Sequence, residues 1–236
     1  MKRSFIREIL ESIDENTISF AGGLPSEKLF PSEDLKNATL KIFDNPKVFQ
    51  YGISNGISEL REKIASRYTK EGFETSKENI LITTGSQQAM YILAKFYESK
   101  DITIEEPSYL GAMNIFRLNH LTMKGVKLES NGVNLNEFEQ SFKNTKLAYL
   151  IPDFQNPSAT TYSDEKRERI AKIVKENDGI LIEDSPYSEL FFDKKNISIS
   201  SKIPKNSFHL GSFSKTLVPS LRIGWIRADE DLISHP

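Results

Sequence analysis

The chain has 236 residues, of which 38% are hydrophobic and 27% charged, as in a soluble globular protein with one large domain or one domain and a small appendage. Its formal charge of −2 argues against nucleic acid as the main partner, because phosphate binding favours a basic surface. The absence of cysteine excludes disulfides and thiolate chemistry, and no stretch approaches the ~20 apolar residues of a membrane span. Residues 1–11 alternate charged and apolar side chains, unlike a signal peptide, so we expect a cytoplasmic location.

Helical and strand-like segments alternate from about Glu59 onward. Helices are expected at 58–68, 86–97 and 164–176, the last one capped by Ser163. Short apolar strands are expected at 79–83, 102–105, 147–151, 179–183, 208–210 and 223–226. Pro25 and Pro31 break regular structure, so we interpret residues 1–45 as an arm or irregular segment ahead of a domain at 46–236.

Strands separated by helices imply crossover connections and a mainly parallel α/β sheet covered on both faces. Ligands bind such sheets beyond the carboxyl ends of the strands, and most candidate residues follow a strand. Gly85, Ser86 and Gln87 open the helix at 86–97, where backbone N–H groups and the helix dipole attract an anion such as phosphate. By itself, so short a motif is more often an ordinary capped helix.

Four side chains after other strands can hold a flat aromatic ring. Tyr109 can stack on such a ring, and Asp184 can pair with a ring nitrogen and keep it protonated. Asn156 and Tyr187 can each donate a hydrogen bond to a ring oxygen. The plainer interpretations are a half-buried tyrosine, an Asn-Pro turn and a loop cap, and these compete at each position taken alone.

Lys215 lies between two serines and a threonine in a run that has no simple explanation as a core strand. A lysine amine is a covalent catalyst when its charge is suppressed beside a carbonyl. Arg222 suits bidentate contact with phosphate, and Ser212 can reach the same group. Each alone is more often a surface charge or turn residue, but chance agreement across six separate loops is far rarer than at one.

The run 211–225 resembles the Schiff-base lysine segment of the pyridoxal-phosphate (PLP) enzymes of the aminotransferase class I/II family. Segments 18–25 and 29–31 resemble the branch that holds 2-aminoadipate/kynurenine and multi-substrate aminotransferases, and the aminotransferase-like domains of MocR-type transcription regulators are similar too. The resemblance implies the large domain of PLP-dependent transferase fold type I, a mainly parallel seven-stranded sheet flanked by helices, with an N-terminal arm.

The resemblance also implies PLP as the cofactor, with Lys215, Asp184 and Tyr109 as catalytic residues and no metal. The residues expected at the cofactor are Gly85, Ser86, Gln87, Tyr109, Asn156, Asp184, Tyr187, Ser212, Lys215, Arg222 and Tyr51. Tyr51 resembles the tyrosine that reaches the phosphate of a neighbouring subunit's PLP, which implies a homodimer with shared active sites. Gly23, Asn156 and Arg7 resemble substrate contacts.

The implied reaction moves an amino group between an amino acid and a 2-oxo acid by ping-pong chemistry through a Lys215 aldimine. Family members continue into a C-terminal small domain whose arginine clamps the substrate carboxylate, whereas this chain ends at Pro236. We therefore expect the PLP pocket to be encoded here and the clamp to be absent.

Three alternatives remain open from the sequence. One is another fold-type I reaction, such as a C–S lyase or a decarboxylase. A second is a non-catalytic PLP-sensing domain of a regulator, although the motifs begin by Ile18 and leave no room for a winged helix. The third is a truncated, inactive relic.

Overall fold

The computed structural model describes residues 14, 16–18, 23–98 and 100–234, and the chain divides into two units, residues 1–44 and 45–236. In the first unit, helix α2 (Ser32–Phe43) follows a short 3₁₀ turn, η1 (Glu27–Leu29). The sequence predicted an arm or irregular segment here. Pro31, which was expected to break regular structure, directly precedes α2. A proline at the start of a helix is compatible with it because the first N–H groups have no intrahelical partner.

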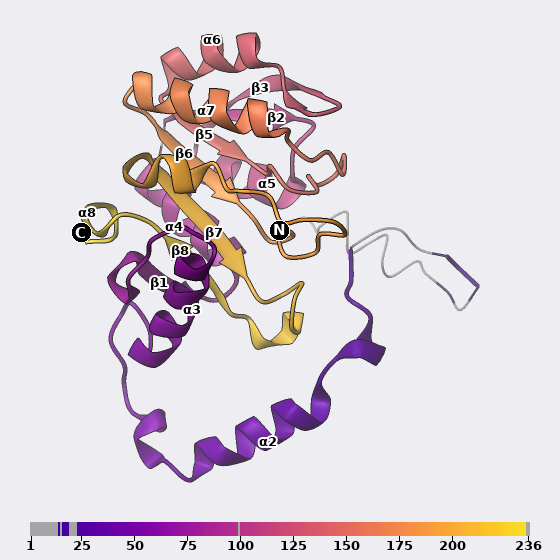
Figure 1. The fold of residues 1–236 in the computed structure, drawn as a ribbon, viewed down its shortest axis with the longest axis vertical. Helices are drawn as coiled ribbons and strands as arrows, with labels where there is room; N and C mark the ends of the chain where they lie inside the picture. Colours follow the sequence, from indigo (N-terminus) through magenta and orange to yellow (C-terminus); the bar gives the residue numbers. More distant parts are fainter. Residues whose placement is uncertain (1–13, 15, 19–22, 99, 235–236) are drawn as a thin grey trace. The chain divides into compact units, whose positions relative to one another are not determined.

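The second unit is built on an eight-stranded sheet with the order β1-β8-β7-β6-β5-β2-β3-β4 (Figure 1). The strands are β1 (Ile80–Thr83), β2 (Asp101–Glu106), β3 (Thr122–Glu129), β4 (Gly132–Val133), β5 (Leu147–Leu150), β6 (Ile180–Asp184), β7 (Ser207–Ser212) and β8 (Gly224–Arg227). The pairs from β7 through β6, β5 and β2 to β3 are parallel, whereas β8 is antiparallel to both β1 and β7. The expected mainly parallel sheet is confirmed, but it has eight strands where seven were expected, and the smallest is the two-residue β4.

Helices connect the strands. They are α3 (Ser58–Lys70), α4 (Ser86–Phe96), α5 (Leu110–Leu118), α6 (Leu135–Thr145), α7 (Asp164–Glu176) and α8 (Glu230–Ile233), with 3₁₀ turns η2 (Pro46–Phe49), η3 (Lys77–Asn79), η4 (Ser200–Lys202), η5 (Pro204–Asn206) and η6 (Pro219–Leu221). The three expected helices correspond to α3, α4 and α7. As expected, Ser163 caps α7, since its Oγ accepts a hydrogen bond from the Lys166 N–H at 3.3 Å.

Side chains alternate across each strand, so the sheet has a separate core on each face. On one face, Tyr149 and Ile182 pack with α4 and α5. On the other face, Ala148 and Leu181 pack with α6 and α7, and Tyr68 of α3 packs nearby against β1 and β8. Within the described part of the chain, no helix is long and apolar enough to cross a membrane.

Candidate cofactor site

The carboxyl ends of five strands lie at one edge of the sheet. Strands β2, β5, β6 and β7 are parallel, and β1 has the same direction as β7 because β8 runs antiparallel between them. Most of the candidate residues end or follow one of these strands. The fold therefore brings them to a common edge, where α/β proteins bind ligands.

Gly85 and Arg222 meet at the start of α4, the corner that the sequence predicts to bind an anion. Gly85 has a φ of 76° and immediately precedes the first turn, whose N–H groups are the natural anion donors of a helix. A Cβ built on Gly85 would lie 2.6 Å from Arg222 Nη2, so the guanidinium contacts the glycine directly. Arg222 Nη2 also donates to the Thr84 carbonyl at 3.4 Å.

Gly224 was not recognised as part of this corner from the sequence. A Cβ on it would lie 2.6 Å from the carbonyl carbon of Gly85 and 2.7 Å from the Ser86 nitrogen. Only a glycine at the start of β8 therefore allows α4 to begin here. A glycine within a predicted apolar strand was the available signal, because it often marks a close backbone approach.

Gln87 connects the anion corner to Tyr109. Its Nε2 donates to the Tyr109 hydroxyl at 3.3 Å. The Tyr109 ring lies against Gly111, where a Cβ would be 2.5 Å from the ring Cζ. The half-buried ring is thus fixed at the edge, with its hydroxyl hydrogen-bonded to Gln87 of α4. Burial raises the pKa of this hydroxyl.

Asp184 is a buried carboxyl with one oxygen bonded and one oxygen open. Its Oδ2 accepts a hydrogen bond from the Tyr149 hydroxyl at 2.7 Å, while Oδ1 is buried without a hydrogen-bond partner among the described residues. Burial raises the pKa of Asp184 to about 6, and the Tyr149 hydrogen bond opposes that rise. A buried polar atom without a partner needs an explanation, and a ring N–H donor from a bound group supplies one.

Asn156, Tyr187 and Lys215 lie together. Asn156 Nδ2 donates to the Tyr187 hydroxyl at 3.5 Å, and Lys215 Nζ is 5.7 Å from the centroid of the Tyr187 ring. Burial lowers the pKa of Lys215, which increases the fraction of nucleophilic neutral amine. The expected ring-oxygen donors and the expected Schiff-base lysine are therefore neighbours.

Ser212 is buried at the end of β7, where its hydroxyl belongs to a local turn. Its Oγ accepts from the Ser214 N–H at 3.1 Å and lies 3.0 Å from the Ser214 hydroxyl. Tyr51 is not brought into this group, since its side chain is 99% exposed. Gly23, which has a φ of 52°, belongs to the first unit. Arg7 lies outside the described residues.

A second buried carboxyl, Glu105, was missed by sequence reasoning. Its oxygens accept hydrogen bonds from the Ile151 N–H at 3.0 Å, the Gln155 amide at 2.9 Å and the Tyr162 hydroxyl at 2.7 Å. Burial raises its pKa to about 7. Glu105 thereby ties the end of β2 to the loop that carries Asn156. A charged residue inside an apolar strand was the signal that could have indicated it.

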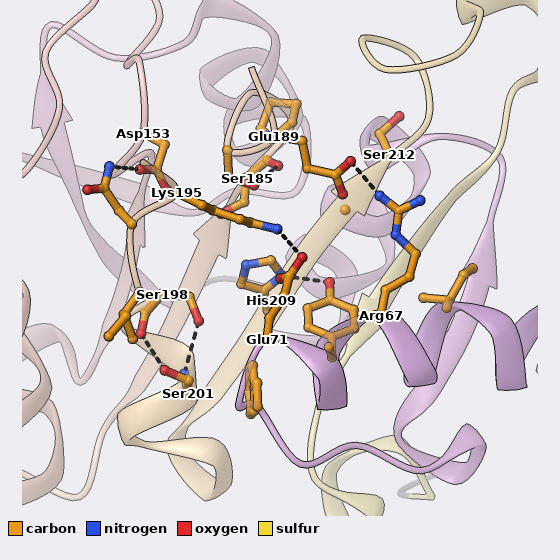
Figure 2. A pocket seen from close by; sticks show the side chains of 18 of the residues that line it. Arg67, Glu71, Asp153, Ser185, Glu189, Lys195, Ser198, Ser201, His209 and Ser212 are labelled. Carbon is orange, nitrogen blue, oxygen red and sulfur yellow. Dashed lines mark hydrogen bonds and ion pairs between the residues drawn. The ribbon is translucent and has the colours of Figure 1, made fainter. Parts of the chain in front are cut away.

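A cavity of about 260 Å³ lies on the opposite face of the sheet from Asp184, between α3 and the segment 185–201 (Figure 2). Lys195 pairs with Glu71 at 2.6 Å, and Arg67 pairs with Glu189. These two ion pairs join α3 to the segment that carries Tyr187. The cavity borders the candidate site at Ser212 but contains none of the candidate ring contacts.

The sheet order and the lysine at its carboxyl edge define a fold-type I α/β domain. The chain matches the family model of aminotransferase class I and II over residues 16–235, and it belongs to that family. The family membership and the fold class expected from the sequence are thereby confirmed.

Known proteins resemble the chain over nearly its whole length. It is 33% identical to aromatic-amino-acid aminotransferase 1 of Thermococcus litoralis, over 99% of this chain and 60% of that protein. The structure of LysN, an α-aminoadipate aminotransferase from Thermus thermophilus complexed with N-(5'-phosphopyridoxyl)-L-leucine, has a TM-score of 0.87 at 33% identity and covers 98% of this chain and 60% of that one. The HTH-type transcriptional regulator YisV of Bacillus subtilis, itself uncharacterised, is 30% identical over 96% of this chain and 49% of its own length. The chain thus spans about 60% of the aminotransferases it matches.

Proposed function

We propose that the chain is the cofactor-binding portion of a pyridoxal 5′-phosphate-dependent aminotransferase, which moves an amino group between an amino acid and a 2-oxo acid. The open Oδ1 of Asp184, at the same sheet edge as Lys215, is the observation that carries the proposal. Family membership and the phosphopyridoxyl compound bound to the similar LysN structure support the choice of cofactor.

The phosphate would be held by the start of α4 and its neighbours. The residues proposed for it are Gly85, Ser86, Gln87, Ser212 and Arg222. The contact between Gly85 and the Arg222 guanidinium supports this role, because it places a fixed cation beside the helix N-terminus.

The ring would lie between the side chains of the neighbouring loops. Tyr109 would stack on it, while Asn156 and Tyr187 would donate hydrogen bonds to its oxygen. Asp184 would accept the ring N–H through Oδ1 and keep the ring nitrogen protonated. When bound, the cofactor supplies an electron sink for the charge released at the substrate Cα.

Lys215 would hold the cofactor covalently and, once released, take the proton from the substrate Cα and return it. Both roles need a neutral amine for part of the time, and the lowered pKa caused by burial supports them. Tyr109, Asp184 and Lys215 would thus be the catalytic residues.

The rest of the proposal concerns the substrate, a second subunit and the location of the protein. Gly23, Arg7 and Asn156 would contact the substrate. The full exposure of Tyr51 supports a role at the phosphate site of a second subunit in a homodimer. A cytoplasmic location is proposed with it, and cell fractionation tests that.

Absorption spectroscopy tests the cofactor proposal. Wild-type protein mixed with PLP should show a visible Schiff-base band that Lys215→Ala lacks, whereas Lys195→Ala, which changes a lysine paired with Glu71, should keep it. Asp184→Asn should retain PLP but slow its conversion by an amino acid roughly a hundredfold, because a preorganised charge is lost. Identical spectra for wild type and Lys215→Ala would remove Lys215 from the site.

A second candidate function is the PLP-sensing domain of a regulator, which the similarity to YisV favours. Both candidates bind PLP at Lys215, so turnover separates them. Incubation with amino acids and 2-oxoglutarate should yield glutamate if the chain transaminates and none if it only senses. Release of ammonia or carbon dioxide without glutamate would indicate a lyase or a decarboxylase.

A further inference from the structure

Tyr149 lies beside Asp184 in the interior of the sheet. Its hydroxyl donates to Asp184 Oδ2 at 2.7 Å. Tyr149 is on β5 and Asp184 is on the adjacent strand β6, with the register pairing Tyr149 to Ile182 and Leu150 to Glu183. Alternation along β6 places Ile182 and Asp184 on one face, the same face as Tyr149.

The Tyr149 ring is held rigidly. It is fully buried and meets the Phe116 ring edge-on, with the centroids 5.2 Å apart and an interplanar angle of 76°. Phe116 belongs to α5, the helix that begins directly after Tyr109. One helix therefore supports both the proposed ring stacker and the partner of the proposed ring-nitrogen acid.

The hydroxyl of Tyr149 can act only as the donor in this pair. Burial and the nearby Asp184 carboxyl raise the pKa of Tyr149 well above its ordinary value, so the phenol keeps its proton. A hydrogen bond to a charged oxygen is stronger than one to a neutral oxygen, so the donation favours the carboxylate form of Asp184.

We propose that Tyr149 is a positioning residue that keeps Asp184 anionic and leaves Oδ1 as the one oxygen available to the cofactor's ring N–H. The inference rests on the proposed function for the identity of that donor. Burial alone favours a neutral carboxyl, which would offer a proton where an acceptor is needed. The Tyr149 hydrogen bond opposes that tendency without occupying Oδ1.

Other titratable groups act on the pair and need to be monitored with it. Glu105 on β2 and Tyr109 before α5 act on Tyr149, and Asp184 acts in turn on Glu105, on Tyr109 and on Tyr187 after β6. Helices α4 and α5, which cover this face, present apolar side chains to it.

The first test is made without cofactor. In protein labelled at aspartate Cγ, NMR titration should show the proton affinity of Asp184 rising about ten- to a hundredfold in Tyr149→Phe, the range expected for one hydrogen bond to a charged group. Tyr162→Phe is the matched control, because Tyr162 is equally buried and donates to a different carboxyl, Glu105, at 2.7 Å. Because Glu105 and Asp184 interact electrostatically, this control can move the Asp184 titration only through that coupling, and the shift should be much smaller than in Tyr149→Phe.

The second test uses protein loaded with ring-¹⁵N-labelled PLP. The nitrogen shift of the wild type and of Tyr162→Phe should be that of a protonated ring, and Tyr149→Phe should move toward the unprotonated value. An unchanged Asp184 titration in Tyr149→Phe would overturn the inference. If the Asp184 titration shifts in Tyr149→Phe but the wild type does not bind PLP, the proposed function is overturned. The coupling then concerns the two side chains alone.

A gentler variant covers the case in which Tyr149→Phe does not fold. Site-specific 3-fluorotyrosine at position 149 keeps the ring and strengthens the donor, since fluorine makes the phenol more acidic. Asp184 should then bind its proton more weakly than in the wild type. A stronger or equal proton affinity would contradict the role given to Tyr149.

Discussion

The guanidinium of Arg222 occupies the space that a side chain on Gly85 would need, with Nη2 only 2.6 Å from the position of a built Cβ. The contact depends on the pairing of β1 with β8, in which Thr83 is opposite Gly224. Arg222 has a left-handed backbone with a φ of 53°, and its Nη1 donates to the Pro219 carbonyl at 3.1 Å. The cation and the helix N-terminus are thus held side by side, as the proposed phosphate site requires.

Gly85→Ala should weaken PLP binding more than it weakens the fold. A methyl group there would push Arg222 away, and the φ of 76° would cost about 1–2 kcal/mol for any residue with a Cβ. Fluorescence titration should show PLP affinity falling at least about tenfold, the loss of one charge-assisted contact. Gly72→Ala is the control, because Gly72 has a φ of 83° with no atom within 4 Å of a built Cβ. It should lose stability and keep its affinity.

Asp184 should make the cofactor-free chain less stable as the pH rises. Its pKa is raised by burial from 3.8 to about 6, so its contribution is fully present below pH 3.8 and is lost as the pH rises through about 6. The shift corresponds to about 3 kcal/mol. Between pH 4 and pH 7, the free energy of unfolding of Asp184→Asn, measured in urea, should rise by about that much relative to the wild type. If the exposed control Asp178→Asn gains equally, the effect does not come from burial.

His209 should act in the opposite direction. The Tyr68 hydroxyl accepts from Trp225 Nε1 at 2.7 Å and is hydrogen-bonded to His209 Nδ1 at 2.9 Å. Burial lowers the pKa of His209 from 6.5 to about 4, so its contribution is present above pH 6.5 and is lost as the pH falls through about 4.

The matched variants separate this effect from other acid-sensitive groups. His209→Asn keeps a hydrogen-bonding group beside Tyr68 but cannot titrate, so it should remove about 3 kcal/mol of acid destabilisation between pH 6.5 and 4. His120→Asn, at an exposed position, should not change the slope. Equal slopes for wild type and His209→Asn would contradict the neutral, buried histidine. Because Asp184 and His209 oppose each other over this range, the wild-type curve should be flatter than either variant's.

The fold could be predicted largely from its buried strands. The segments 147–151 and 179–183 are continuous apolar runs, as expected for strands covered on both faces, and both are present as β5 and β6. Strand β3 was missed because it lies near the sheet edge and contains Gly125, whose built Cβ would meet the Glu106 carboxylate at 2.7 Å. Half of its residues are exposed and only Val126 is buried, so it has little of the apolar pattern that marks a strand.

The candidate site was predictable where a residue ends or follows a strand and not where it lies inside one. Asp184 follows an apolar run, and its chemistry stands out against that background. Tyr149 and Glu105 are inside strands, where a sequence pattern gives burial but not the partner across the sheet. Only the register between β5 and β6 shows that the Tyr149 hydroxyl reaches Asp184.

Tyr51 provides a test of shared sites between subunits. Its side chain is 99% exposed, so its loss should barely change the stability of one chain. If it completes the phosphate site of a second subunit, Tyr51→Phe should weaken PLP binding by about tenfold, one hydrogen bond to a charged group. The measurement is PLP titration above and below the dissociation concentration found by analytical ultracentrifugation, and the difference between the two proteins should disappear when the chains are separate.

The decisive comparison for Tyr51 mixes Tyr51→Phe with Lys215→Ala. If Tyr51 crosses to the other subunit, one site of a hybrid dimer receives both changes and the other receives neither. About half of the hybrids' sites should then bind PLP with full affinity, because one phosphate site and its lysine remain intact together. A mixture whose hybrids have no high-affinity sites would show that Tyr51 serves its own chain. A Tyr51→Phe homodimer with wild-type affinity would show that Tyr51 serves neither site.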